Sequence, residues 1–164
     1  MTLPKLREYV NILKANSFKN NRKVIIAPPY TLLLPLFHMT EGTNISISAQ
    51  NMFFEEKGAF TGEISPLHLL DAHAEYVIIG HSERRTIFRE DNSLIAKKLK
   101  SAITHGLIPI FCVGESKDDR DSGNTEYIIQ HQIEEGLSLL NSQEISIIII
   151  AYEPVWAIGT GVNA

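Results

Sequence analysis

The sequence has few of the features that mark disulfide-stabilised or membrane-spanning proteins. It contains one cysteine, Cys112, so an intrachain disulfide framework is excluded and a reducing, cytoplasmic location is expected. Because Cys112 lies inside an apolar stretch, we expect an inert core thiol rather than a reactive one. The longest apolar runs, 107–113 and 147–152, are far shorter than the roughly 20 residues that span a bilayer, and the first residues lack the apolar segment of a secretory leader.

Positive charge is also in short supply. The 164 residues include 15 Lys and Arg against 19 Asp and Glu, a net charge of −4, which gives no basic footprint for nucleic acid. We therefore expect no nucleic-acid partner and no membrane partner. The cations are scattered, apart from the pairs Arg84-Arg85 and Lys97-Lys98, and a solvated surface is the expectation for them. With 44% hydrophobic residues and no divisive linker, residues 1–164 are expected to form a single domain.

Short apolar runs alternate with amphipathic segments along the chain. Runs typical of buried strands occupy 24–27, 45–49, 76–80, 107–113 and 147–151. Helical spacing is found over 3–13, 32–37, 65–70, 92–105 and 128–140, and a charged loop is expected at 117–124. This alternation predicts an α/β fold with parallel strands, either an open doubly wound sheet or part of a (β/α)8 barrel. The absence of a G-x-G-x-x-G turn weakens the first alternative.

One carboxylate follows the last apolar run abruptly. Residues 146–161 read SIIIIAYEPVWAIGTG, which predicts a strand buried on both faces of a parallel sheet, with Glu153 at its carboxyl end. Catalytic groups gather at that edge of such sheets, so Glu153 is a candidate acid or base. The alternative is a carboxylate that caps a helix or pairs with an Arg. Pro154 provides a stiff start, and Gly159 and Gly161 a permissive end, for a closing lid.

A histidine stands in the equivalent place after another run. His81 follows 76–80, and Ser82 is a plausible N-cap for a helix whose N-terminal dipole disfavours an imidazolium. A neutral imidazole can donate to a substrate oxygen while a carboxylate such as Glu153 takes a carbon-bound proton, which is the chemistry needed beside a carbonyl. A hydrogen-bonded structural histidine is the alternative. Gln50 and Asn51 end a further strand and suit either a polar ligand or a neighbouring loop.

Two long segments resemble a known family. Residues 76–85, YVIIGHSERR, and 151–161, AYEPVWAIGTG, closely resemble the most diagnostic segments of the triosephosphate isomerases, with shorter matches at 27–30, 50–51, 58–63 and 112–115. The resemblance covers essentially the whole chain. It implies a (β/α)8 TIM barrel, here a partial barrel of about five parallel strands with alternating helices. It also implies interconversion of dihydroxyacetone phosphate and D-glyceraldehyde 3-phosphate through an enediolate, in glycolysis and gluconeogenesis, with no cofactor and no metal.

The same resemblance implies roles for individual residues. Glu153 matches the general base, His81 the neutral electrophile, and Ser82 and Glu83 their supporting residues. The lid begins with the hinge residues Pro154, Val155 and Trp156 and continues through Ala157, Ile158, which covers the pocket, and Gly159, whose N–H reaches the substrate phosphate. Tyr152 and Glu115 resemble the residues that hold the lid. Thr61 resembles the residue that enters the partner's site in a homodimer; without the family, a simple loop hydroxyl would be the preferred interpretation.

Parts of the family pattern have no match in these 164 residues. They are the first strand with its Asn-x-Lys segment, and the last two strands with their phosphate-binding loops. The simplest interpretation is a partial sequence of an isomerase, which we expect to be inactive alone and prone to aggregation at its two open edges. A non-catalytic binding or scaffold protein derived from the barrel is the alternative. A nucleotide-binding α/β enzyme would need a phosphate loop that the sequence lacks.

Overall fold

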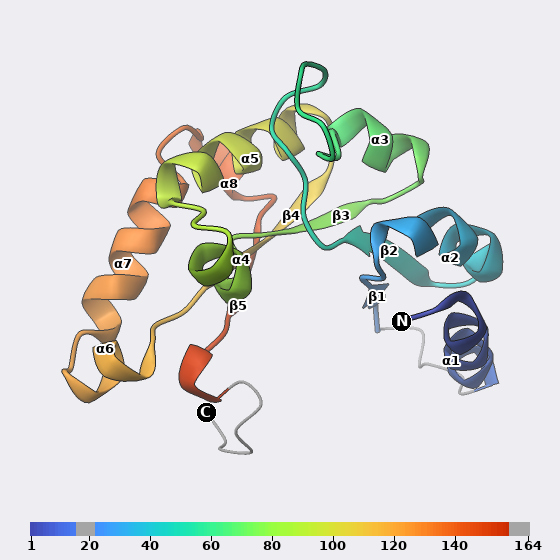
Figure 1. Ribbon diagram of the computed structural model, residues 1–164, viewed down its shortest axis with the longest axis horizontal. Helices are drawn as coiled ribbons and strands as arrows, with labels where there is room; N and C mark the ends of the chain where they lie inside the picture. Colours follow the sequence, from blue (N-terminus) through green and yellow to red (C-terminus); the bar gives the residue numbers. More distant parts are fainter. Residues whose placement is uncertain (16–21, 158–164) are drawn as a thin grey trace.

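The computed structural model describes residues 1–15 and 22–157, in which five parallel strands form one curled sheet (Figure 1). The strands are β1 (Val24–Ile26), β2 (Ile45–Ala49), β3 (Tyr76–Ile79), β4 (Ile108–Val113) and β5 (Ile149–Tyr152). Each strand pairs in parallel with the next one along the chain. A doubly wound sheet reverses its strand order at a switch point, whereas this order never reverses. The predicted partial barrel of about five strands is therefore confirmed.

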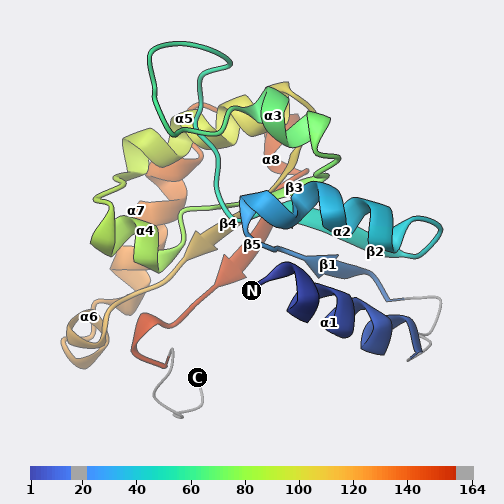
Figure 2. The ribbon, with the colours of Figure 1, turned by 45° about the vertical axis from the view of Figure 1, so that its right-hand side comes forward.

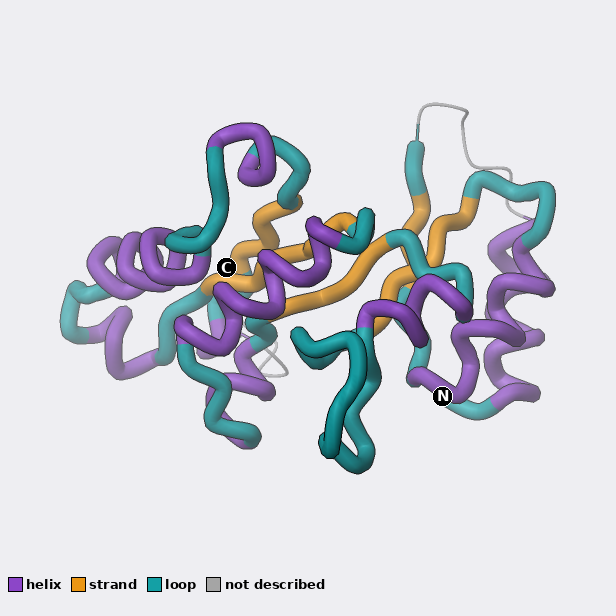
Figure 3. The backbone as a smooth tube through the Cα atoms, turned by 90° about the horizontal axis from the view of Figure 1, so that it is seen from above, coloured by secondary structure: helices purple, strands orange, loops and turns teal. Residues whose placement is uncertain are grey.

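Helices alternate with these strands (Figure 2). In chain order they are α1 (Leu3–Ala15), η1 (Tyr30–Leu32), α2 (Leu33–Thr40), α3 (Pro66–Asp71), α4 (Ser82–Ile87), α5 (Asn92–Thr104), α6 (Lys117–Asp121), α7 (Thr125–Gly136), α8 (Ser142–Ile145) and η2 (Val155–Ala157). Viewed from above, the strands form a curved row with helices beside it (Figure 3). None of the described helices is long and apolar enough to cross a membrane.

One hydrophobic core joins the helices to the strands. Helix α5 contributes Ile95, Leu99 and Ala102, which recur at helical spacing and are fully buried. The helix begins at Asp91, whose carboxylate accepts the Leu94 N–H at 2.7 Å. Its buried stripe packs on β3 and β4, where Phe111 is also fully buried. The core thus orders the central strands, and these strands end at the candidate site.

The structure corrects two boundaries between charged loop and helix. The expected loop at 117–124 contains α6, because Ser116 and Asp119 form a reciprocal capping box that starts a helix despite the high charge. The expected helix at 128–140 ends at Gly136 instead. A Cβ on Gly136 would lie 2.5 Å from the Phe111 ring, so this glycine lets the end of α7 approach β4 closely.

The strand that precedes Glu153 differs from the prediction in both extent and burial. The run of four isoleucines predicts a strand at 147–151 buried on both faces, but β5 covers Ile149–Tyr152 and is mostly exposed. Ile149 and Ile150 are 42% and 47% exposed. Among the described residues β5 pairs only with β4, so it is an edge strand in this sheet. The prediction of full burial is therefore wrong for the described structure.

Candidate active site

The two candidate catalytic residues lie together at the carboxyl edge of the sheet. His81 follows β3 and Glu153 follows β5, with β4 between them. The His81 Nε2 atom lies 3.2 Å from Glu153 Oε2, and both side chains are partly buried. Two residues 72 positions apart in sequence are thus in contact at the strand ends, as their positions after two apolar runs predict.

Ser82 holds the Glu153 carboxylate from two directions. The Ser82 N–H donates to Oε1 at 2.8 Å, and the Ser82 hydroxyl donates to Oε2 at 3.2 Å. Ser82 is the first residue of α4, where unpaired amides favour a negative charge. The carboxylate therefore binds the first residue of α4, as expected if Glu153 only caps a helix. It also contacts His81, as expected if the two residues form a site.

His81 itself is the N-cap of α4, so the expectation that Ser82 caps the helix is wrong. The His81 Nδ1 atom accepts the Glu83 N–H at 3.3 Å, and the imidazole thereby takes the place expected of the hydroxyl. A neutral ring whose Nδ1 accepts carries its proton on Nε2, the atom that faces Glu153. The Glu83 side chain is largely exposed and lies 4.0 Å from His81 Nδ1.

The backbone around Glu153 packs tightly against β4. The Glu153 N–H donates to the Val113 carbonyl at 2.9 Å, and a Cβ on Gly114 would lie 1.8 Å from the Glu153 carbonyl oxygen. Only glycine at position 114 allows this approach. Cys112 is buried in the same place, and burial together with the neighbouring Glu153 raises the pKa of its thiol to about 12. The thiol stays protonated, in agreement with the expected inert cysteine.

Glu115 connects the end of β5 to the segment that follows it. Its side chain is fully buried and accepts the Trp156 indole N–H at 2.9 Å and the Tyr152 hydroxyl at 3.0 Å. The Val155 N–H donates to the Glu115 carbonyl at 3.2 Å, and Arg120 lies 3.6 Å from the carboxylate. Burial acts to raise the pKa of Glu115, but the hydrogen bonds from Trp156, the backbone and Tyr152 together hold it below its usual value.

The predicted lid is described only in its first part. Pro154, Val155, Trp156 and Ala157 are described, and the last three form η2 directly after Glu153. The Arg120 guanidinium lies over the Trp156 ring, 4.2 Å from its centroid. The predicted lid residues Ile158 and Gly159 lie outside the described residues.

Thr61 is exposed and lies in a turn of the 50–65 loop, in which the Glu63 N–H donates to the Phe60 carbonyl at 2.9 Å. The loop projects beyond the helices (Figure 1), and its tip is exposed. Its base is held by the Phe53 N–H, which donates to Ile64, and the Phe53 and Phe60 rings pack at 4.6 Å. Gly58 has a φ of +151°, and a Cβ there would lie 2.4 Å from the Phe60 ring, so the loop needs glycine at this position.

A pocket of about 250 Å³ adjoins His81, and its lining includes Tyr30, Gln50, Asn51, Ile78, His81, Glu83, Arg84 and Phe88. The two amides at the end of β2 bind neighbouring segments of the chain: Gln50 donates to Ala27 at 3.0 Å, and the Asn51 side chain accepts from Lys98 at 2.9 Å. No group of three or more His, Cys, Asp or Glu in the described parts of the chain is placed to hold a metal ion.

A buried charged cluster that the sequence pattern did not predict includes Arg84, one of the residues that line this pocket. Lys98 is 1% exposed and donates to Glu90 at 2.6 Å, and Arg84 donates to the same Glu90 oxygen at 2.6 Å. Arg85 also binds within the protein, with its Nε donating to the Gly80 carbonyl at 2.7 Å. The expectation of a solvated surface is therefore wrong for these three cations, because each has buried acceptors within reach.

Comparisons with known proteins agree with the geometry. A family model described as triosephosphate isomerase matches residues 1–164. Relatives named triosephosphate isomerase include one from Clostridium tetani, 52% identical over 142 residues (87% of this chain, 56% of that protein). The protein from Dictyoglomus thermophilum is 50% identical over 159 residues (97% and 63%). The protein from Treponema denticola is 46% identical over 164 residues (100% and 66%). The chain spans less than two thirds of the length of each of these relatives.

Proposed function

Because the chain belongs to the triosephosphate isomerase family, we propose that the protein interconverts dihydroxyacetone phosphate and D-glyceraldehyde 3-phosphate, a step of glycolysis and gluconeogenesis. The observation that carries this proposal is the contact of 3.2 Å between the His81 imidazole and the Glu153 carboxylate at the carboxyl edge of a partial barrel. A base and a hydrogen-bond donor in contact are the two groups that a proton shift beside a carbonyl requires.

Glu153 acts as the base. Its carboxylate removes a proton from the hydroxyl-bearing carbon next to the substrate carbonyl, and the electron pair moves to the carbonyl oxygen to give an enediolate. The hydroxyl proton moves to the former carbonyl oxygen, and the protonated Glu153 then gives its proton to the former carbonyl carbon, so that a new carbonyl forms on the carbon that lost its proton. The two hydrogen bonds from Ser82 hold the carboxylate in a defined position at the carboxyl edge of the sheet. To reach a substrate carbon, the carboxylate exchanges its contact with the start of α4 for a position in the pocket.

His81 acts as the electrophile. The Glu83 N–H donates to Nδ1, so the neutral imidazole presents its Nε2 proton, and that proton can bind the substrate oxygens as negative charge develops. The role of Glu83 in this proposal is the orientation of His81 through its backbone N–H. Ser82 likewise orients Glu153 rather than reacting itself.

The segment after Glu153 acts as the hinge of a lid. Pro154, Val155 and Trp156 leave the sheet beside the base, and Glu115 and Tyr152 hold them through the contacts with the buried carboxylate. The roles of Ala157 and Ile158 as part of the lid, and of the Gly159 N–H as a phosphate ligand, rest on the family resemblance.

The protein is also proposed to act in the cytoplasm as a homodimer, in which Thr61 enters the site of the partner subunit. The exposed tip of the 50–65 loop, which is stiffened by the packing of Phe53 on Phe60, supports a role in contacting a partner. The single hydrophobic core supports the expectation that residues 1–164 form one domain.

The test is a coupled assay of isomerisation with the native protein from its source, because we expect residues 1–164 alone to be inactive. We expect Glu153→Gln and His81→Gln each to lower kcat by about 10²- to 10⁴-fold, and the exposed control Glu55→Gln to leave it unchanged. Phosphoglycolate, a mimic of the enediolate, should raise the Tm of the native protein and of the control. An active protein whose kcat is unaffected by both site substitutions would refute the assignment.

A further inference from the structure

Positive charge is concentrated at one end of this acidic protein. Residues 1–40 contain six Lys and Arg and a single acid, Glu8, which gives a net charge of +5, whereas the whole chain carries −4. This segment supplies α1 and α2, which pack against each other on the side of the sheet that holds β1 (Figure 2). The potential at this end therefore favours anions, while the rest of the surface repels them.

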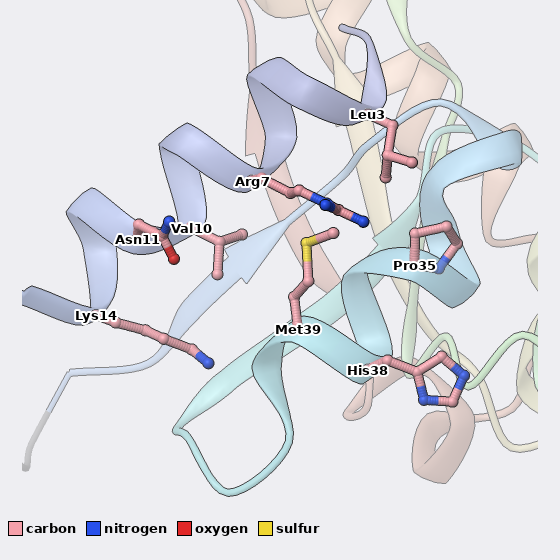
Figure 4. A pocket seen from close by; sticks show the side chains of 8 residues that line it. All are labelled: Leu3, Arg7, Val10, Asn11, Lys14, Pro35, His38 and Met39. Atoms are coloured by element: carbon pink, nitrogen blue, oxygen red, sulfur yellow. The ribbon is translucent and has the colours of Figure 1, made fainter.

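A groove of about 570 Å³ lies between α1 and α2, within the size range of small-molecule sites (Figure 4). Its apolar surface comes from Leu3 and Val10 on α1 and from Pro35 and Met39 on α2. Val10 is 1% exposed and is the most buried of these four residues. Such a surface fits the apolar body of a ligand.

Two cations of α1 flank the apolar floor. Arg7, Val10 and Lys14 follow at spacings of three and four residues, so they share one face of the helix, with the two charges about 10 Å apart along its axis. Figure 4 shows both side chains extending from α1 toward α2. At the α2 side of the groove, the His38 Nδ1 lies 4.0 Å from the exposed Glu41 carboxylate.

The ion pairs within the described residues use other cations, namely Arg84, Lys98, Lys100, Lys117 and Arg120. Residues 16–21, which follow α1, contain no acid that could pair with Lys14. Arg7 and Lys14 are both exposed. Their charges can therefore pair with a ligand without the loss of an ion pair inside the described part of the chain.

We propose that the groove between α1 and α2 binds an organic anion that has an apolar body and carboxylate or phosphate groups about 10 Å apart. One acidic group lies beside Arg7, the other beside Lys14, and the apolar body covers Val10 and Met39. The groove shares no lining residue with the pocket beside His81, and the inference does not depend on the isomerase proposal.

The experiment is an NMR titration of the ¹⁵N-labelled protein with three probes that share a ten-carbon body: decanedioate, decanoate and decane-1,10-diol. We expect decanedioate to cause saturable shifts of amides in α1 and α2. Its affinity should exceed that of decanoate by about two- to fivefold, because a partly exposed ion pair contributes modestly. The neutral diol should bind more weakly than decanoate by a similar factor, because it forms neither ion pair.

Matched variants distinguish binding in the groove from nonspecific attraction of anions to the positive charge of residues 1–40. Arg7→Gln and Lys14→Gln should each weaken decanedioate by about two- to fivefold and leave decanoate bound, whereas Lys5→Gln, an exposed cation of the same helix outside the groove, should have no such effect. Circular dichroism checks that each variant is folded. The proposal is overturned if the diol binds as well as the diacid, if the shifts lie elsewhere, or if Lys5→Gln weakens binding as much as Arg7→Gln.

Discussion

Replacing Glu90 by Gln should destabilise the protein more than removing its buried partner Lys98. The Glu90 carboxylate is 4% exposed and accepts from both Arg84 and Lys98 at 2.6 Å, while its second oxygen has no partner in the described residues. The cluster therefore holds two cations and one anion. Removal of the anion leaves Lys98, 1% exposed, without a counter-charge.

The magnitudes follow from what each substitution leaves unpaired. Glu90→Gln leaves a buried ammonium, which costs about 3–5 kcal/mol of the free energy of unfolding. Lys98→Met keeps the pair between Arg84 and Glu90 and deprives Asn51 of one donor, a loss of about 1–3 kcal/mol. The double variant should be more stable than Glu90→Gln alone, because it no longer buries an unpaired cation.

Urea denaturation followed by circular dichroism measures these differences, with Lys5→Met, an exposed lysine of α1, as the control that should change stability by less than about 0.5 kcal/mol. Burial lowers the pKa of Lys98, and Glu90 opposes this shift. A lysine whose pKa is lower in the folded state than in the unfolded state makes stability rise with pH up to its ordinary pKa, so Glu90→Gln should recover part of its loss as the pH rises toward that value. The reasoning fails if the double variant is no more stable than Glu90→Gln.

Three further predictions concern residues around the site. The Cys112 thiol has a folded pKa of about 12 against 9.0 when exposed, so stability should fall as pH rises above 9; Cys112→Ala should remove up to about 1.4 kcal/mol per pH unit from this fall in urea titrations between pH 9 and 10. An unchanged slope would contradict the assignment. Gly114→Ala should destabilise by about 3 kcal/mol or more in the same assay, because its Cβ would lie 1.8 Å from the Glu153 carbonyl oxygen; a loss below about 0.5 kcal/mol would show that the contact relaxes freely. Glu115→Gln should weaken the charged hydrogen bond to Trp156, the single tryptophan of the chain, and move its fluorescence emission to longer wavelength; an unchanged spectrum would argue against this hold on the hinge.

The apolar runs predicted strands most accurately where the strand pairs with a neighbour on both sides. The run at 45–49 became β2 with the expected bounds, and every residue in it is buried. The run at 147–151 shows the limit of the same reasoning, because composition cannot tell a central strand from an edge strand. Residues 117–121 were predicted as a loop because of their high charge, but they form a helix. The pair Ser116 and Asp119, three residues apart, is the capping box that indicates where this helix starts.

For the candidate site, the sequence predicted which residues lie at the strand ends but not which side chains they contact. His81 and Glu153 could be selected because each follows an apolar run, and parallel strands bring their carboxyl ends to one edge. The buried Lys98 was missed because its neighbour Lys97 is exposed and a sequence pair reads as one surface patch. Its place three residues after Ile95 and four before Ala102, on the buried stripe of α5, is the signal that could have identified it.

The candidate base and the hinge of the proposed lid are parts of one short segment, and this limits how they can move. Glu153 lies between Tyr152, whose hydroxyl binds the Glu115 carboxylate, and Val155, whose N–H binds the Glu115 carbonyl. Its own carbonyl packs against Gly114, the residue that precedes Glu115. A hinge motion that breaks the contacts of Glu115 must therefore also shift the backbone that carries the Glu153 carboxylate. Lid closure and release of that carboxylate from Ser82 should then occur together rather than as independent steps.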